Sequence, residues 1–159
     1  MMITINIALL LLLFYVFYQD VKERKVTLLL FILLFVIGGF LNWKQQVFEV
    51  FTINSIINII TICMVMLILY LYSKFKMKIE LFHGFGLGDL LFFLFMAISF
   101  PTLSFLVLFS TSLIFSFIIS IVFRKRLKEL VPLAGLQALF LGLIIGANQI
   151  FNITNLYAF

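Results

Sequence analysis

Five uncharged, apolar runs divide the chain, and they constrain its fold more than any other feature. They cover residues 1–19, 26–43, 50–73, 90–123 and 130–159. The hydrocarbon core of a bilayer is about 30 Å thick, and a helix of about 20 apolar residues spans it. Only 11% of the residues are charged, against about 25% in ordinary globular proteins, so a soluble domain is excluded. The sequence therefore predicts an all-α, polytopic membrane helical bundle, with residues 1–159 as a single integral membrane domain.

The fourth run, residues 90–123, is too long for one crossing. As a single helix it would reach roughly 51 Å. Pro101 supplies a break, because proline lacks a backbone donor and disfavours helical geometry in the residue before it. The sequence therefore predicts about six transmembrane helices, with approximate spans 3–19, 27–43, 50–72, 89–101, 103–123 and 131–151.

The positive charges fall in alternate loops of this six-helix arrangement. Ten of the eleven Lys and Arg residues lie in the segments 20–26, 73–89 and 124–130, and Lys44 is the exception. These three segments share one face of the membrane only if run 90–123 crosses it twice. The charge pattern of the loops and the length of this run therefore both predict two crossings. By the positive-inside rule this face is cytoplasmic and both termini are outside. The first run precedes its positive charges, which indicates a retained helix rather than a secretory signal.

The only two aspartates are predicted to lie on that cytoplasmic face. Asp20 ends the first predicted helix, and Asp89 starts the fourth, directly after the glycine-rich run 84–88. Two nearby carboxylates can share a proton, because both cannot ionise cheaply. The ionised acid can then take a proton from water while the protonated acid donates to an amide carbonyl, which is chemistry for peptide hydrolysis. The residues alone leave another interpretation open, in which Asp89 is a helix N-cap and Asp20 a charge at the membrane rim.

Three segments together resemble the type IV prepilin peptidases and preflagellin peptidases, which are membrane aspartyl proteases with a GxGD signature. Residues 20–26 (DVKERKV) are similar to the first family motif, and residues 86–89 (GLGD) match the second. Residues 128–134 (KELVPLA) are similar to the proline-containing start of the last helix in the family. Two positions depart from the family pattern: Thr27 stands where proline is common, and Leu91 stands where lysine is common.

The resemblance implies a membrane aspartyl endopeptidase with Asp20 and Asp89 as the catalytic pair and with Gly86 and Gly88 shaping the substrate path. Its substrate would be a pilin-like or flagellin-like precursor of a type IV pilus or related system, whose short leader it removes. It would lie in the prokaryotic cytoplasmic (inner) membrane with its active site facing the cytoplasm. The alternative is a non-catalytic membrane subunit of a pilus or secretion apparatus.

No cofactor, metal or nucleic-acid partner is expected. The chain has one histidine, His83, and one cysteine, Cys63, which cannot supply a metal-ligand set. Under the resemblance, the lone cysteine also indicates a compact form without the cytosolic CxxC domain of larger family members. The basic residues lie in short loops, where lipid headgroups are the expected neighbours. Gly142 and Gly146 permit close helix packing, either within the bundle or in a homodimer. Asn42 lies near a predicted span end and indicates no site.

Overall fold

The computed structural model describes residues 2–77, 86–123, 132–151 and 156, and every regular element within these ranges is helical. The predicted all-α helical bundle is thereby confirmed. Segments 78–85 and 124–131 and most of the C-terminal tail, with the sequence expectations that fall on them, lie outside the described residues. The helices are α1 (Met2–Glu23), α2 (Leu28–Gln45), α3 (Phe48–Tyr72), α5 (Leu87–Ser99), α6 (Thr102–Val122) and α7 (Leu133–Phe151), and the π-helix η1 (Ser73–Met77) extends α3.

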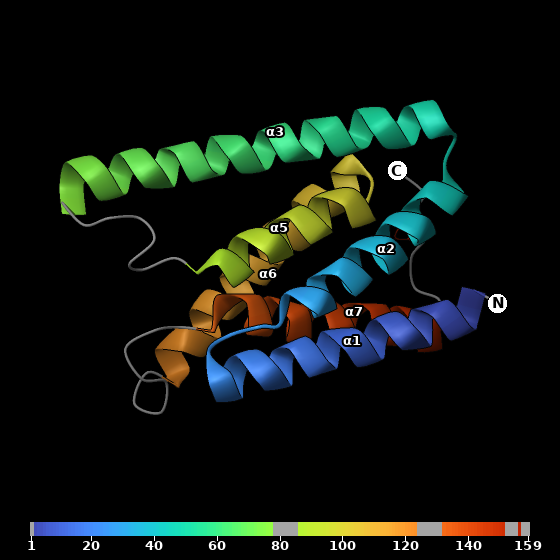
Figure 1. Cartoon of the computed structure of the whole chain (residues 1–159), viewed down its shortest axis with the longest axis horizontal. Coiled ribbons are helices and arrows are strands. Elements are labelled where there is room, and N and C mark those ends of the chain that lie inside the picture. The colour runs from blue at the N-terminus through green and yellow to red at the C-terminus, as the bar shows by residue number, and fades with distance from the viewer. Residues whose placement is uncertain (1, 78–85, 124–131, 152–155, 157–159) are drawn as a thin grey trace.

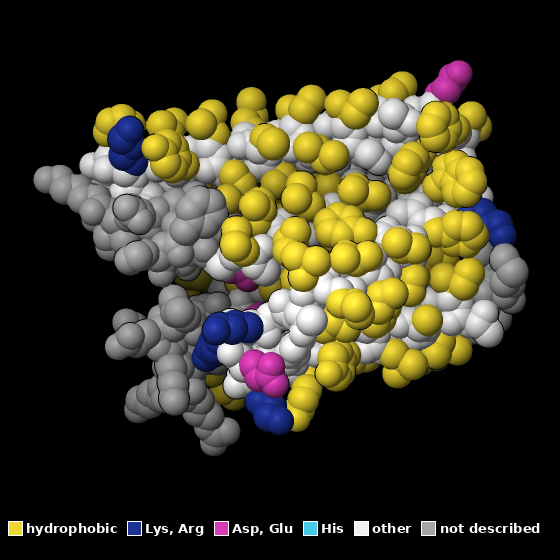
Figure 2. Space-filling view, in the orientation of Figure 1, with side chains coloured by type: hydrophobic (Ala, Val, Ile, Leu, Met, Phe, Trp, Pro, Cys, Tyr) yellow, Lys and Arg dark blue, Asp and Glu magenta, His cyan; other side chains and the backbone are white. Residues whose placement is uncertain are grey.

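Five of the helices in the described ranges are long and apolar enough to cross a membrane: α1, α2, α3 with its extension to Phe75, α6 and α7. Their outward side chains are apolar along most of their length, and Lys and Arg gather toward the two ends of the molecule (Figure 2). Apolar side chains on an outer surface indicate contact with lipid, because lipid does not penalise their exposure. The chain is therefore a multi-pass membrane protein.

Successive helices run in opposite directions along the bundle, and α1 packs antiparallel to α7 (Figure 1). One end of the molecule thus contains the end of α1, the start of α5 and the start of α7. Because Asp20 lies in the last turn of α1 and Asp89 in the first turn of α5, we call this the aspartate end.

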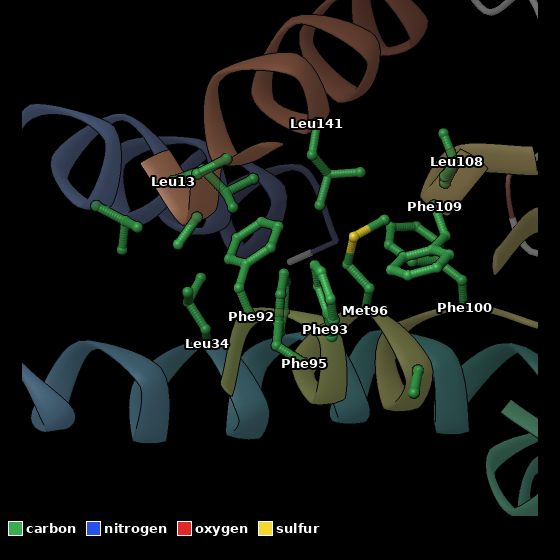
Figure 3. Close-up of a cluster of buried hydrophobic side chains, with 14 of the residues drawn as sticks. Leu13, Leu34, Phe92, Phe93, Phe95, Met96, Phe100, Leu108, Phe109 and Leu141 are labelled. Carbon is green, nitrogen blue, oxygen red and sulfur yellow. The ribbon is translucent and has the colours of Figure 1, made fainter. Parts of the chain in front are cut away.

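The short helix α5 forms the centre of the bundle, in contact with α2, α3, α6 and α7. Its 13 residues are strongly apolar, and Phe92, Phe93, Phe95 and Met96 are at most 1% exposed. Their side chains fill the space between the surrounding helices (Figure 3). Phe93 meets Phe109 of α6 edge to face, with ring centroids 4.9 Å apart. The packing of α5 thus holds Asp89 at a fixed level relative to the longer helices.

The opposite end of the bundle contains a chain of polar side chains where α5 stops. Asn58 of α3 donates to the carbonyl oxygens of Ala97 and Phe100 at 2.9 and 3.0 Å, and Asn42 of α2 donates to that of Ile98 at 2.8 Å. These carbonyls have no intrahelical partner because the helix breaks before Pro101. Side-chain bonds join Thr102 to Asn54, Asn54 to Gln46 and Gln46 to Asn42. We call these residues, with Asn58, the asparagine network.

Asn42 therefore has a role that the sequence did not predict. Placed near the end of an apolar run, it is typical of a residue in the headgroup region, but its side chain is fully buried. The amide is needed inside because it satisfies the carbonyl of Ile98 and accepts a hydrogen bond from Gln46. A buried polar group is tolerated when it is hydrogen-bonded in this way.

Aromatic and lysine side chains four residues apart mark both ends of the bundle. In each pair the lysine Nζ lies over the ring of the residue one turn before it, at 5.2 to 5.8 Å from the ring centroid. Aromatic rings and snorkelling lysines are typical of the membrane–water interface. The pairs are Tyr18–Lys22 and Tyr70–Lys74 at the aspartate end, and Phe40–Lys44 at the other end.

Gly142 and Gly146 both face α1 within the chain. An added Cβ would meet Phe14 and Leu13 at position 142, and Leu10 at position 146, all at ordinary contact distances of 3.7 to 3.9 Å. The small residues thus allow α1 and α7 to pack closely. Of the two uses that the sequence left open for this pattern, the structure displays packing within the bundle.

Candidate active site

Asp20 is a buried carboxylate in the last turn of α1. It is 8% exposed, although it lies between Tyr18 and Lys22, which form one of the interfacial pairs. Its Oδ2 accepts a hydrogen bond of 2.7 Å from the backbone N–H of Gly135 in α7. Shortly after Asp20, α1 is ended by Arg24, whose φ of 56° lies in the left-handed region and whose N–H donates to the carbonyl of Asp20 at 3.0 Å. Asp20 is therefore positioned by α7 and by the turn that follows it.

Asp89 is held by two helix N-termini. It is the third residue of α5, and its Oδ2 accepts a 3.1 Å hydrogen bond from the N–H of Gly86, the residue that precedes the helix. Its Oδ1 accepts a 2.7 Å hydrogen bond from the N–H of Ala134 in α7. A residue at this position satisfies a free amide of its own helix start. Asp89 is therefore not the N-cap of α5, because that position is taken by Gly86. One of its oxygens bonds the N-cap amide, and the other bonds a helix far away in sequence.

The two carboxylates meet at the first turn of α7. Asp89 and Asp20 accept from Ala134 and Gly135, which are consecutive residues. The two amide nitrogens are three covalent bonds apart, so the bonded oxygens lie within about 10 Å of each other. The free N–H groups and the positive dipole end of a helix start favour carboxylates. Acidic side-chain atoms are visible in a recess at the aspartate end (Figure 2).

Gly135 makes the close approach of α1 to α7 possible at this point. A Cβ added at Gly135 would lie 2.9 Å from both the Cβ and the Oδ2 of Asp20. Real Cβ atoms essentially never come that close to another heavy atom. Any residue larger than glycine would therefore displace the Asp20 carboxylate from the amide that binds it.

Thr27 and Leu91, the two departures from the pattern of the resembled family, each have a local structural explanation. Thr27 is the N-cap residue before α2, with φ −65° and ψ 131°, and its N–H donates to Oε1 of Gln19 at 3.0 Å. Nε2 of Gln19 in turn donates to Oγ1 of Thr27 at 2.7 Å. This pair of bonds closes the turn after Asp20. Leu91 packs against the apolar core, an environment that suits leucine better than a charged lysine.

The two predicted substrate-path glycines lie beside Asp89. Gly86 is exposed, and Gly88 is half-buried with the Phe31 ring 3.9 Å from the position of an added Cβ. An added Cβ at Gly86 would be 3.3 Å from Oδ2 of Asp89, so a side chain there would crowd the carboxylate. Gly84, which belongs to the same glycine-rich run, lies outside the described residues.

Sequence reasoning identified both acids but missed the backbone that binds them. The resemblance extended to Ala134 but gave no role to Gly135. A signal was present: Pro132 precedes an apolar run, and proline is frequent at a helix start. The Pro132 carbonyl accepts from Leu136 N–H at 3.0 Å, which leaves the amides of Ala134 and Gly135 available for the carboxylates.

Among the described residues, no group of three or more His, Cys, Asp or Glu side chains is arranged to hold a metal ion. His83 lies outside these residues, and Cys63 is exposed on α3. The acids themselves are satisfied by backbone N–H donors. The arrangement offers acid–base chemistry between two carboxyl groups.

The chain was compared with known proteins at the levels of family, sequence and structure. No protein-family model, no curated protein and no solved structure matches it. The assignment of a function therefore depends on the geometry of Asp20 and Asp89 and on the residues around them.

Proposed function

We propose that this protein is a membrane aspartyl endopeptidase that removes the short leader from pilin-like or flagellin-like precursors, with Asp20 and Asp89 as its catalytic pair. One observation carries the proposal: two carboxylates remote in sequence bind adjacent amides at the start of one helix. A charge at the membrane rim does not need a buried backbone partner, and an N-cap needs only its own helix. The family resemblance of residues 20–26 and 86–89 agrees with this use of the acids.

In the proposed mechanism the acids share one proton. The ionised carboxylate takes a proton from water, and the water oxygen attacks the carbonyl carbon of the scissile peptide bond. The protonated carboxyl group donates its proton to the carbonyl oxygen. Collapse of the tetrahedral intermediate breaks the C–N bond, and the amine leaves with a proton returned by the pair. The amides of Ala134 and Gly135 hold both acids in position throughout.

The level of the site in the membrane suits a precursor with an apolar helix. Asp20 lies between the two residues of an interfacial aromatic–lysine pair, so the acids are at the edge of the hydrocarbon layer. A precursor helix held in lipid presents its leader junction at this level. Diffusion in the plane of the membrane also limits its orientations, which lowers the entropy cost of positioning the bond. The positive charges near Asp20 favour the cytoplasmic face of a prokaryotic inner membrane for this end.

The test is leader removal by isosteric variants. Asp20→Asn and Asp89→Asn keep an oxygen that accepts from Gly135 or Ala134, but they remove the titrating group. We expect each to reduce cleavage of a co-expressed pilin-like precursor of the host by about 10²–10⁴-fold. Glu23→Gln is the matched control, because it removes a neighbouring carboxylate at the end of α1, and cleavage should persist. A protein that supports pilus assembly equally well with both asparagines is a non-catalytic subunit.

A further inference from the structure

One buried polar side chain near the aspartates has no hydrogen-bond partner. Gln137 of α7 is fully buried, and neither its Nε2 nor its Oε1 is hydrogen-bonded. A buried amide without partners is destabilising, so such a group in a native structure calls for a reason. Leucine would occupy the same volume without this cost. The amide of Gln137 thus indicates a partner that is absent when the protein is alone.

Gln137 lies just inside the candidate active site. It follows Ala134 by three residues, so it is on the same side of α7 and one turn deeper in the bundle. The N–H of Ala134 binds Asp89. A ligand that extends from Asp89 along α7 into the bundle therefore reaches the turn that contains Gln137.

A second unpartnered group lies at a similar level on the neighbouring helix. Ser116 of α6 is fully buried, and its hydroxyl has no hydrogen-bond partner. Phe115, the adjacent residue, packs against Phe140 of α7 with ring centroids 5.3 Å apart. Phe140 is one turn beyond Gln137, so the contact between α6 and α7 brings Ser116 and Gln137 to nearby levels.

We propose that Gln137, assisted by Ser116, forms a subsite that hydrogen-bonds a backbone peptide group of the precursor, on the membrane side of the cleaved bond. This subsite rests on the proposed function. A peptide bond that is to be attacked must leave its helix, and in lipid the freed N–H and C=O groups then have no water to bind. A carboxamide has both a donor and an acceptor, so it can satisfy one such peptide group. The peptide group of the precursor then bonds the Gln137 carboxamide, and both groups gain the hydrogen-bond partner that they lack when apart.

Cleavage kinetics and thermal unfolding of the full chain in lipid nanodiscs test the subsite. The probe is a pilin-like precursor of the host. We expect Gln137→Leu to unfold at the same or a higher temperature, because an unpaired buried amide is removed, and to lose about tenfold or more in kcat/KM, because a substrate group stays unpaired. Binding of the precursor to an Asp89→Asn protein should weaken by a similar factor when Gln137→Leu is added.

Gln149→Leu is the matched control. Gln149 is on the same helix, about 18 Å further along, and its Oε1 is also buried without a partner. Its replacement should leave kcat/KM and binding unchanged. If Gln137→Leu behaves like this control, the subsite is wrong and Gln137 contacts water only. If Gln137→Leu instead lowers the unfolding temperature, the Ser116→Ala protein provides the test. Unchanged stability of this protein with about threefold weaker cleavage supports the subsite. Unchanged cleavage by this protein overturns it.

The two proposals fail in different ways. A wild-type protein that cleaves no precursor contradicts the peptidase, and the binding measurement still tests the subsite. A wild-type protein that cleaves, together with a Gln137→Leu protein that cleaves and binds equally well, contradicts only the subsite. A wild-type protein that neither cleaves nor binds any precursor contradicts both.

Discussion

Gly135 is the residue on which the distance between Asp20 and α7 depends most directly. We expect Gly135→Ala to push the Asp20 side chain away from the Gly135 amide, because the new Cβ would lie 2.9 Å from its Cβ and Oδ2. Overpacking of this kind costs about 1–3 kcal/mol of unfolding free energy. Under the proposed mechanism, misplacement of the Asp20 carboxylate should reduce leader cleavage about 10²-fold. Thermal unfolding and cleavage assays measure the two effects separately.

Gly142→Ala is the control for this prediction. Gly142 is on the same face of α7, but an added Cβ there makes only ordinary contacts of 3.7 Å or more with Phe14 and Leu13. Cleavage by this variant should match the wild type. Equal activity of the Gly135→Ala protein would mean that the bond between Asp20 and Gly135 is not needed for the reaction.

At the residue scale, the sequence could predict which two carboxylates form the candidate site, but not the backbone amides that bind them. Only two aspartates occur in the chain, and the charge pattern alone places them at one end. Their partners are backbone amides of Ala134 and Gly135. Every residue except proline carries such an amide, so residue type does not reveal which one will bind. Gln137 was missed for a related reason: a polar residue in an apolar helix is conspicuous only once its burial is known.

At the element scale, the turn between α1 and α2 shows how this chain accommodates threonine where the resembled family commonly has proline. The φ of Thr27 is −65°, which proline also adopts. Its N–H and hydroxyl both bond Gln19, however, and proline offers neither group. The same backbone turn is thus held by side-chain hydrogen bonds instead of by a ring.

We expect Thr27→Pro to fold and to keep its activity. The loss of two exposed hydrogen bonds costs about 1–2 kcal/mol, and the restricted unfolded chain restores about 0.4–1 kcal/mol. Gln19→Leu should then be destabilising in the wild type and nearly neutral in the Thr27→Pro background. Thermal unfolding of the four proteins of this double-mutant cycle gives the coupling. Equal costs of Gln19→Leu in both backgrounds would contradict the role of this pair.

Helix α5 illustrates where element-level prediction succeeds and where it stops. The break near Pro101 and the start near Asp89 were predicted from run length and proline chemistry, and the helix spans Leu87–Ser99. Its central position in the bundle was not predicted, because all the runs are similarly apolar and hydrophobicity does not distinguish a lipid-facing helix from an interior one.

At the scale of the whole molecule, the alternating direction of the helices agrees with the charge pattern. Lys22, Arg24, Lys25 and Lys74 lie toward the aspartate end, and Lys44 is at the opposite end. The positive-inside rule then gives the orientation as an expectation. Lys76 lies in η1, and the other basic residues of the aspartate-end loops lie outside the described ranges.

Cysteine accessibility in a Cys63→Ala background tests this orientation. Val47 is exposed in the turn between α2 and α3, so Val47→Cys should react with an impermeant maleimide added to intact cells. Lys25→Cys should react only after the membrane is opened. The reverse pattern would place Asp20 and Asp89 on the outer face and would contradict cleavage of a leader that is still inside the cell.

Because of the asparagine network, the two ends of α5 are held in the bundle by different numbers of hydrogen bonds. Amide side chains from α2 and α3 fasten the last carbonyls of α5, whereas Asp89 at its first turn is attached to α7 by a single hydrogen bond. The first turn of α5 should therefore move more easily than its last turn. Under the proposed function, any widening that admits a precursor is therefore expected to begin between α5 and α7, with the end of α5 at the asparagine network as its pivot.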